Sequence, residues 1–294
     1  MEKILVIKLG ALGDVIRTTP LLRVLSGDIT WVTKKNAFEL LPSNIKKADI
    51  KDEMSIKEIS KIKFDLVLSL EEDKDALNLA SKLKSRSKKF IGVYPSKNSI
   101  KYTPTSAPWF DLSLSSRFGK AKADELKKKN TLSYQEHLFN MIGISFKGEE
   151  YLTDFVPKKV SRKIIGIESR SGDVWPAKQW KGYADLAEKL RKKGYTVRFF
   201  DQKPTLNEYA YDINKCGLVI TGDTLAMHLA LVFKKPTVAI FTCTSAQEIY
   251  DYGRLIKVVS PVLNDYFYTR EAKGVNFKIS VQGVMRAVER FTKK

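Results

Sequence analysis

A chain of 294 residues has room for two domains of ordinary size, and its hydrophobic content of 43% argues against intrinsic disorder. Its two cysteines argue against a disulfide framework or a cysteine zinc site and favour a reducing cytoplasm. A net charge of +19 suits nucleic acid, an anionic membrane surface or phosphorylated substrates as partners, and it equally suits a solvated lysine-rich surface.

In the first half of the chain, short apolar runs alternate with helical patterns. Buried parallel strands are predicted at 4–9, 29–33, 64–70 and 89–94. Helices are predicted at "TTPLLRVLSG", "NAFELL", "DALNLASKLKS" and 133–144, the last of them ending at Gly143. Residues 95–131 lack a regular pattern and are expected to form a long functional loop region. From Lys82 to Lys101 there are seven basic residues and no acidic one.

The same alternation restarts in the second half. Strands are predicted at 164–169, 196–200, 217–221, 236–241 and 256–260, and amphipathic helices at 180–194 and 280–291. Two βα series predict two doubly wound, Rossmann-like α/β domains, at 1–155 and 156–294, with a cleft between them. Whether the last helix packs back on the N-terminal domain is left open.

No hydrophobic segment predicts a membrane anchor. The start "MEKILVIKLG" is typical of a strand rather than of a signal peptide. The most apolar window, 217–233, is too short to span a bilayer and contains Asp223 and His228. The protein is therefore expected to be soluble and cytoplasmic.

The first strand is followed by the glycine turn "GALGD", residues 10–14. It lacks both the dinucleotide spacing G-x-G-x-x-G and the Gly-Lys-Ser/Thr of a Walker A loop. Its position still favours a ligand site, because parallel sheets bind ligands at the carboxyl ends of their strands. Asp14 is either the N-cap of the next helix or, if that helix begins at Pro20 after Thr19, a residue facing the cleft.

Two segments of the second half are candidate phosphate sites. In "GIESRSGDVWPAKQW" (166–180), a Ser/Gly turn before a helix offers backbone N–H groups and Lys178 offers a charge, although a solvated lysine would fit as well. In "VITGDTLAMHLA" (219–230), Asp223 fits an N-cap, whereas the Thr224 hydroxyl and the helix start would fit a second phosphate. His228 on the following helix is more typical of a buried core histidine.

Asp73-Lys74-Asp75 has the D-x-D spacing of metal-dependent sugar transferases. Acidic residues in the first turn of a helix are also what the helix dipole favours. A metal site is the less favoured interpretation.

Three motifs in order, "IKLGALGDVIRTTPLL", "WPAKQW" and "GDTLAMHLA", resemble glycosyltransferase family 9, the heptosyltransferase-type enzymes of bacterial lipopolysaccharide assembly. The resemblance extends over about residues 1–245 and includes "ADELKKKNTLSYQEHLF". It implies a GT-B fold, with the acceptor on the first domain and a nucleotide-sugar donor on the second. It also implies inversion at the anomeric carbon without a required metal or cofactor.

The resemblance assigns roles to individual residues. Asp14 matches the general base, Lys178 the basic residue that meets the donor diphosphate, and Asp223, Thr224 and His228 the donor-binding segment. The strand-end positions add Ser169, Ser171, Asp201 and Gly222 on the donor side and Gly10, Gly13, Arg17 and Thr18 on the acceptor side. Leu225 stands where the family has glycine, and Thr242-Cys243-Thr244 lies where it has "GPT", so the identity of the donor and the tightness of its binding are left open.

The implied function is transfer of heptose or another sugar from a nucleotide donor, ADP-linked among the options, to a glycolipid or lipopolysaccharide-type acceptor. The basic residues would suit a phosphorylated, membrane-borne acceptor, and contact with the inner face of the cell membrane is left open. The alternatives are another GT-B activity such as a nucleotide-sugar epimerase, or a silent sugar-nucleotide binder. A basic nucleic-acid-binding protein is less favoured, because no reader module is recognisable.

Overall fold

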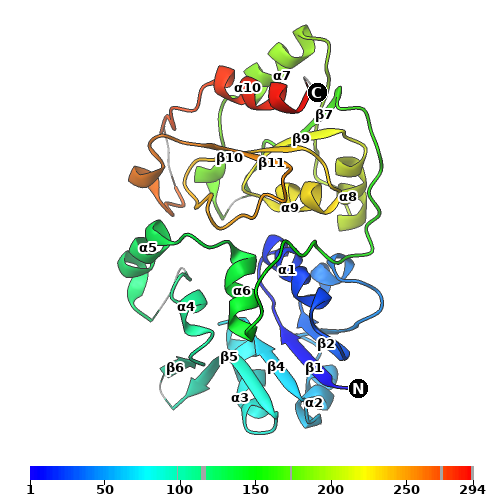
Figure 1. The fold of residues 1–294 in the computed structure, drawn as a ribbon, viewed down its shortest axis with the longest axis vertical. Helices are drawn as coiled ribbons and strands as arrows, with labels where there is room; N and C mark the ends of the chain where they lie inside the picture. Colours follow the sequence, from blue (N-terminus) through cyan, green and yellow to red (C-terminus); the bar gives the residue numbers. More distant parts are fainter. Residues whose placement is uncertain (98, 114–116, 173, 272–273, 293–294) are drawn as a thin grey trace. The chain divides into compact units, whose positions relative to one another are not determined.

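The computed structural model describes residues 1–97, 99–113, 117–172, 174–271 and 274–292. The chain divides into two compact units, Met1–Asp154 (unit 1) and Phe155–Lys294 (unit 2). Each unit contains its own sheet, as Figure 1 shows.

The described strands of unit 1 form one sheet in the order β3-β2-β1-β4-β5-β6. Strands β1 to β5 are parallel and β6 is antiparallel to β5, with β1 in the middle because its apolar run is buried on both faces. The strands are β1 (Lys3–Ile7), β2 (Asp28–Thr33), β3 (Lys46–Asp49), β4 (Leu66–Ser69), β5 (Lys89–Ser96) and β6 (Ser99–Tyr102).

Helices cover this sheet and close its core. Side chains of α2 and α3, among them Ile59 and Leu79, pack on the β1 and β4 residues Leu5 and Val67. The helical segments are α1 (Leu12–Thr18), η1 (Thr19–Arg23), η2 (Lys35–Leu40), α2 (Glu53–Lys61), α3 (Lys74–Lys84), α4 (Ala107–Phe110), α5 (Gly119–Lys129) and α6 (Tyr134–Ile142). Helix α6 begins with a capping box of Ser133 and Glu136 and ends at Gly143, whose φ of 81° favours glycine.

Three expectations for unit 1 were wrong. The helix expected at "TTPLLRVLSG" is the short 3₁₀ segment η1. Residues 95–131 are not one long loop, since they contain β6, α4 and α5. The helix expected at "NAFELL" is the 3₁₀ segment η2. Polar composition hid β3 and α5, because their lysines interrupt the apolar periodicity on which strand and helix predictions depend.

Unit 2 contains a sheet in which all described strands are parallel, in the order β11-β10-β9-β7-β8. The predicted strands are confirmed to within one or two residues. They are β7 (Ile164–Ile167), β8 (Thr196–Phe199), β9 (Leu218–Gly222), β10 (Thr237–Phe241) and β11 (Leu255–Val259).

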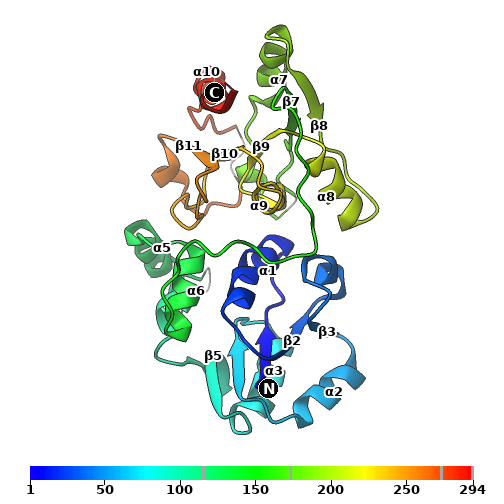
Figure 2. The ribbon, with the colours of Figure 1, turned by 45° about the vertical axis from the view of Figure 1, so that its right-hand side comes forward.

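Helices lie on both faces of the unit 2 sheet, with α7 and α10 on one face and α8 and α9 on the other (Figures 1 and 2). They are η3 (Pro176–Lys178), α7 (Tyr183–Lys192), α8 (Leu206–Asn214), α9 (Leu225–Val232), η4 (Leu263–Tyr266) and α10 (Val281–Thr292). The buried side chains Val284 and Val288 of α10 belong to the core of unit 2, together with Leu186 and Ile240. The last helix therefore packs within its own unit.

Both sheets have a topological switch point, where successive crossover connections leave in opposite directions. In unit 1 it lies between β1 and β4, and in unit 2 between β7 and β9. Ligands of doubly wound proteins bind at the carboxyl ends of the strands beside such a point. The residues that follow β1, β4, β7 and β9 are therefore the first place to look for function.

Candidate functional site

Asp14 lies in the first turn of α1, which begins at Leu12. The N-cap of α1 is Ala11, so neither the N-cap role for Asp14 nor a main helix beginning at Pro20 is correct; Pro20 lies in the short 3₁₀ segment η1. The Asp14 side chain is 35% exposed, and its Oδ1 lies 2.7 Å from the Arg17 guanidinium. The carboxylate thus lies in the helix that follows β1 and is accessible to solvent.

Arg17 lies over an aromatic ring of α6. Its Cζ is 3.8 Å from the centroid of the Tyr134 ring, a close cation–π contact. The Tyr134 hydroxyl is 2.9 Å from Thr18 Oγ1, and burial raises the pKa of this phenol. Arg17 and Asp14 are therefore held by α6 as well as by α1.

Thr18 does not fit the acceptor-binding role expected for it. Its side chain is fully buried, and its hydroxyl donates to the Asp14 carbonyl at 2.7 Å. Thr18 joins α1 to α6 and has no surface that a ligand could reach.

A carboxylate binds the backbone at the start of the glycine turn. Glu71, which follows β4, accepts hydrogen bonds from the N–H groups of Leu9 at 3.2 Å and Gly10 at 2.8 Å. The same oxygen, Oε2, lies 3.1 Å from the ammonium of Lys8. This arrangement spans the switch point of unit 1, and the turn is a carboxylate site rather than a phosphate site.

Lys8 is 6% exposed and lies among charged and polar groups. Burial by itself lowers its pKa, but Tyr134, Glu71 and Asp14 outweigh that effect and hold the pKa of Lys8 above its ordinary value. The ammonium also donates to the Leu70 carbonyl at 3.3 Å. Lys8 therefore stays charged and fixed beneath the turn that positions Asp14.

Glycine is needed at position 10 because a side chain would not fit there, and not because of its backbone angle, since its φ is not positive. A Cβ at this position would lie 2.9 Å from Asp14 Cβ and 3.2 Å from Lys8 Cε. Any side chain here would therefore displace the Asp14 carboxylate.

Gly10→Ala is expected to lower the free energy of unfolding by about 1–3 kcal/mol, because overpacking forces α1 or Lys8 to move. Urea unfolding measures this change. As a control, Gly283→Ala in α10 meets only the flexible Ser280 Oγ at 3.2 Å. It should raise stability by about 0.5–1 kcal/mol, since alanine is the better helix former. Equal effects of the two substitutions would contradict the packing argument.

The four acidic residues at 71–75 serve four separate purposes. Glu71 binds the glycine turn, and Glu72 accepts a hydrogen bond from the Tyr102 hydroxyl. Burial raises the pKa of Glu72. Asp73 caps α3, and Asp75 pairs with Lys51. In the described part of the chain, no group of three or more His, Cys, Asp or Glu side chains is placed to hold a metal ion.

In unit 2, a lysine–carboxylate pair again spans the switch point. Lys178 comes from η3, after β7, and its ammonium lies 2.9 Å from Oδ2 of Asp223, which follows β9. The same ammonium donates to the Asp223 carbonyl at 3.0 Å. Both side chains are about one-sixth exposed, at 17% and 16%. Lys178 is therefore a partly buried, paired cation rather than a solvated lysine.

The segment that departs from the family pattern helps to build this pair. The Thr244 hydroxyl donates to Asp223 Oδ2 at 2.8 Å, and the buried Thr242 hydroxyl donates to the Ala177 carbonyl at 2.7 Å. The loop after β10 thus holds both η3 and Asp223. Leu225 is the first residue of α9 and is partly exposed.

Thr224, rather than Asp223, is the N-cap of α9, and its side chain makes no capping hydrogen bond. Its hydroxyl lies 3.0 Å from the Thr221 hydroxyl. A Cβ on Gly222 would lie 3.3 Å from the Lys178 carbonyl, so this glycine permits close approach of η3. His228 is 4% exposed within α9, and its predicted role in binding the nucleotide-sugar donor stays a prediction.

The turn after β7 differs from the expected helix start. The next helical segment is the three-residue η3, and α7 begins only at Tyr183. The N–H of Ala177 in η3 is already bound to the Arg270 carbonyl at 2.9 Å. Ser169 and Ser171 are partly exposed, and Asp173 lies outside the described residues. A phosphate there would meet side chains rather than a helix N-terminus.

Asp201 follows β8, the strand at the edge of the sheet, and is exposed. Its role toward a ribose stays a prediction. Gly13 is partly exposed in the first turn of α1, and its acceptor role stays a prediction too.

Sequence reasoning missed Lys8, Glu71 and Tyr134, and it noted Thr244 only as part of a departure from the family pattern. A buried strand ending in lysine, "ILVIK", and an acid directly after β4 were available signals for the Lys8–Glu71 pair. Nothing local identifies the contacts of Tyr134 or Thr244, because each side chain meets a residue far away in the sequence.

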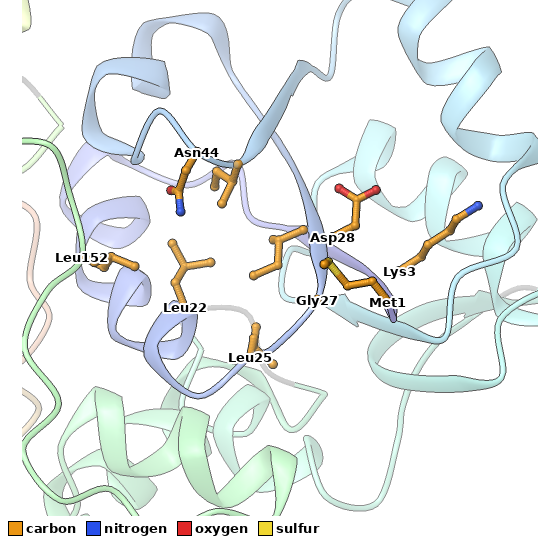
Figure 3. Close-up of a pocket in the computed structure, with 10 residues that line it drawn as sticks. Met1, Lys3, Leu22, Leu25, Gly27, Asp28, Asn44 and Leu152 are labelled. Carbon is orange, nitrogen blue, oxygen red and sulfur yellow. The ribbon is translucent and has the colours of Figure 1, made fainter.

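A cavity of about 540 Å³ lies in unit 1 at the amino ends of β1 and β2, with Leu22, Leu25 and Leu152 among its lining (Figure 3). Its volume would suit a small ligand. It lies at the opposite end of β1 from the glycine turn, and nothing connects it to the candidate site. Among the described residues no helix is both long and apolar enough to cross a membrane.

Two doubly wound α/β units in one chain, together with the likeness to solved structures given below, define a protein of the GT-B fold. The resemblance expected from the motifs is confirmed: residues 202–266, which include Asp223 and Thr224, match glycosyltransferase family 9 (heptosyltransferase). Over 130 residues the chain is 28% identical to lipooligosaccharide heptosyltransferase 2 of Haemophilus influenzae. That match spans 33% of this chain and 37% of the relative.

Solved structures match along nearly the whole length. A glycosyl transferase family 9 protein from Veillonella parvula has a TM-score of 0.67 and 22% identity, with 98% of this chain and 96% of that chain covered. The E. coli heptosyltransferase WaaC, solved with ADP-2-deoxy-2-fluoro heptose, has a TM-score of 0.59 and 13% identity, with coverages of 98% and 99%. At these identities the likeness is one of fold.

Proposed function

We propose that this chain is an inverting glycosyltransferase that moves a sugar, heptose or a related one, from a nucleoside-diphosphate donor to a hydroxyl of a glycolipid acceptor. The observation that carries the proposal is the Lys178–Asp223 pair at the unit 2 switch point, with Asp223 inside the matched segment. The relatives support the donor class, since WaaC was solved with an ADP-linked heptose analogue.

In the proposed reaction Asp14 accepts the proton of the acceptor hydroxyl. The acceptor oxygen forms a bond to the anomeric carbon on the face opposite the leaving group, so configuration inverts. The bond to the nucleoside diphosphate breaks, and its electron pair leaves with the diphosphate. Lys178 and the Thr224 hydroxyl stabilise the developing charge, and no metal takes part.

Unit 1 is proposed to bind the acceptor. Gly10 and Gly13 leave room beside Asp14, and Arg17 offers a cation to an anionic acceptor group. The seven basic side chains from Lys82 to Lys101 are all exposed and would favour a phosphorylated acceptor or an anionic membrane surface. The chain would then act in the cytoplasm, at the inner face of the membrane.

A thermal-shift panel of ADP, GDP, UDP and CMP, each with and without EDTA, tests the donor proposal. A nucleoside diphosphate at about 100 times its Kd should stabilise the chain by about 2.7 kcal/mol, and EDTA should leave the shift unchanged. CMP, which lacks the diphosphate, should have a smaller effect. A shift that needs a divalent metal would contradict the metal-independent mechanism, and binding without transfer to any glycolipid would favour a silent sugar-nucleotide binder.

A further inference from the structure

Two cationic side chains make cation–π contacts with the indole ring of Trp175. Trp175 is half-buried between β7 and η3, and the Lys178 ammonium lies 5.4 Å from its ring centroid. The Arg270 guanidinium, from the segment after β11, lies 5.5 Å from the same centroid. Arg270 is therefore placed next to the switch point of unit 2 by an aromatic ring that it shares with Lys178.

Several contacts fix this arrangement. The Ala177 N–H donates to the Arg270 carbonyl at 2.9 Å, and the Tyr268 N–H donates to the Cys243 carbonyl at 2.7 Å. The Tyr268 ring packs edge-on against Trp175 at 6.0 Å. Segments that follow β7, β10 and β11 thus meet at Trp175.

One of the two cations at Trp175 has no carboxylate partner among the described residues. Lys178 and Asp223 form an ion pair, so together they carry no net charge. Arg270 is exposed, and no carboxylate in the described part of the chain pairs with its guanidinium. A diphosphate carries more than one negative charge, which the Lys178–Asp223 pair alone cannot neutralise.

We infer that Arg270 is a second cation for the donor diphosphate, held by Trp175 beside Lys178. Its planar guanidinium can donate two parallel hydrogen bonds to phosphate oxygens, which an ammonium cannot do. The cation–π contact restrains the guanidinium before the ligand arrives, so less conformational entropy is lost on binding. This inference rests on the proposed function and names a residue that the motifs left out.

Calorimetric titration of ADP and adenosine into three variants tests the inference. Arg270→Gln should weaken ADP binding about 10- to 100-fold and leave adenosine binding unchanged, because only the charge-assisted hydrogen bonds to phosphate are lost. Arg270→Lys keeps the charge and should recover part of the affinity. Arg286→Gln, on the exposed face of α10, is the matched control and should bind ADP like the unaltered chain.

If Arg270→Gln binds ADP within twofold of the unaltered chain, Arg270 does not contact the diphosphate and the inference fails while the proposed function stands. Equal weakening of ADP and adenosine would also overturn it, since that result indicates a disturbed loop. Absence of nucleoside diphosphate binding by the unaltered chain would instead reject the proposed function.

Discussion

Asp14→Asn is expected to lower the rate of sugar transfer about 100- to 10,000-fold, the usual contribution of a general base. Asparagine keeps the shape of the side chain in the first turn of α1 but cannot accept the acceptor proton. Asp14→Ala should be at least as damaging. Both rates are measured with ADP-heptose and a glycolipid acceptor under saturating conditions.

The loss should be confined to catalysis. ADP affinity should stay unchanged, because the donor is proposed to bind unit 2. Thermal stability should fall only modestly, by what the Asp14 charge contributes through Arg17 and Lys8. Asp28→Asn, an exposed acidic position of unit 1 paired with Lys46, is the matched control and should transfer normally. Turnover of the Asp14 variants within tenfold of the unaltered chain would remove Asp14 from the role of base.

Glu71→Ala is expected to lower the free energy of unfolding by about 3 kcal/mol, because it leaves the buried Lys8 charge without its carboxylate. The N–H groups of Leu9 and Gly10 also lose their acceptor. Glu71→Gln keeps an acceptor oxygen and should lose less stability. Urea unfolding monitored by circular dichroism gives both values.

A double variant separates the contribution of the Lys8–Glu71 ion pair to the free energy of unfolding from that of side-chain packing. Lys8→Met with Glu71→Leu should recover much of the stability lost in Glu71→Ala, since an apolar pair leaves no buried charge uncompensated. Glu58→Ala, which removes an exposed partner of Lys61, should cost less than about 1 kcal/mol. A loss in Glu71→Ala no larger than that of Glu58→Ala would show that the Lys8–Glu71 pair does not support the turn.

Each unit has a lysine–carboxylate ion pair at the switch point of its sheet. In each, a lysine from the segment at the end of the first strand meets a carboxylate that follows the neighbouring strand. In unit 1 the lysine side chain is 8% exposed and the carboxylate binds the start of the glycine turn. In unit 2 the lysine side chain is 17% exposed and the carboxylate has a hydroxyl partner. The first pair therefore suits a structural role, whereas the more accessible lysine of the second suits contact with a ligand.

Local patterns allowed much of the fold to be predicted. The strands of unit 2 and the central strands of unit 1 are short, continuous runs of apolar residues. Such runs are typical of buried strands, because an amphipathic helix would alternate apolar and polar residues with a period of 3.6. The segment 95–131 could not be predicted, because β6 and α5 are polar and exist only through their packing on β5 and within unit 1. The helix start at Leu12 was also missed, since Pro20 offered a stronger local signal than Ala11.

The sequence by itself determined two βα series and located Asp14, Lys178 and Asp223 at strand ends, because hydrophobic periodicity and glycine turns are local properties. Only the tertiary structure decided what those residues meet. Lys8 and Glu71 are 63 residues apart in the chain, and Lys178 and Asp223 are 45 apart, so strand order alone brings each pair together. The position of the glycine turn predicted a ligand site, and only the fold shows that Glu71 accepts hydrogen bonds from the N–H groups of Leu9 and Gly10.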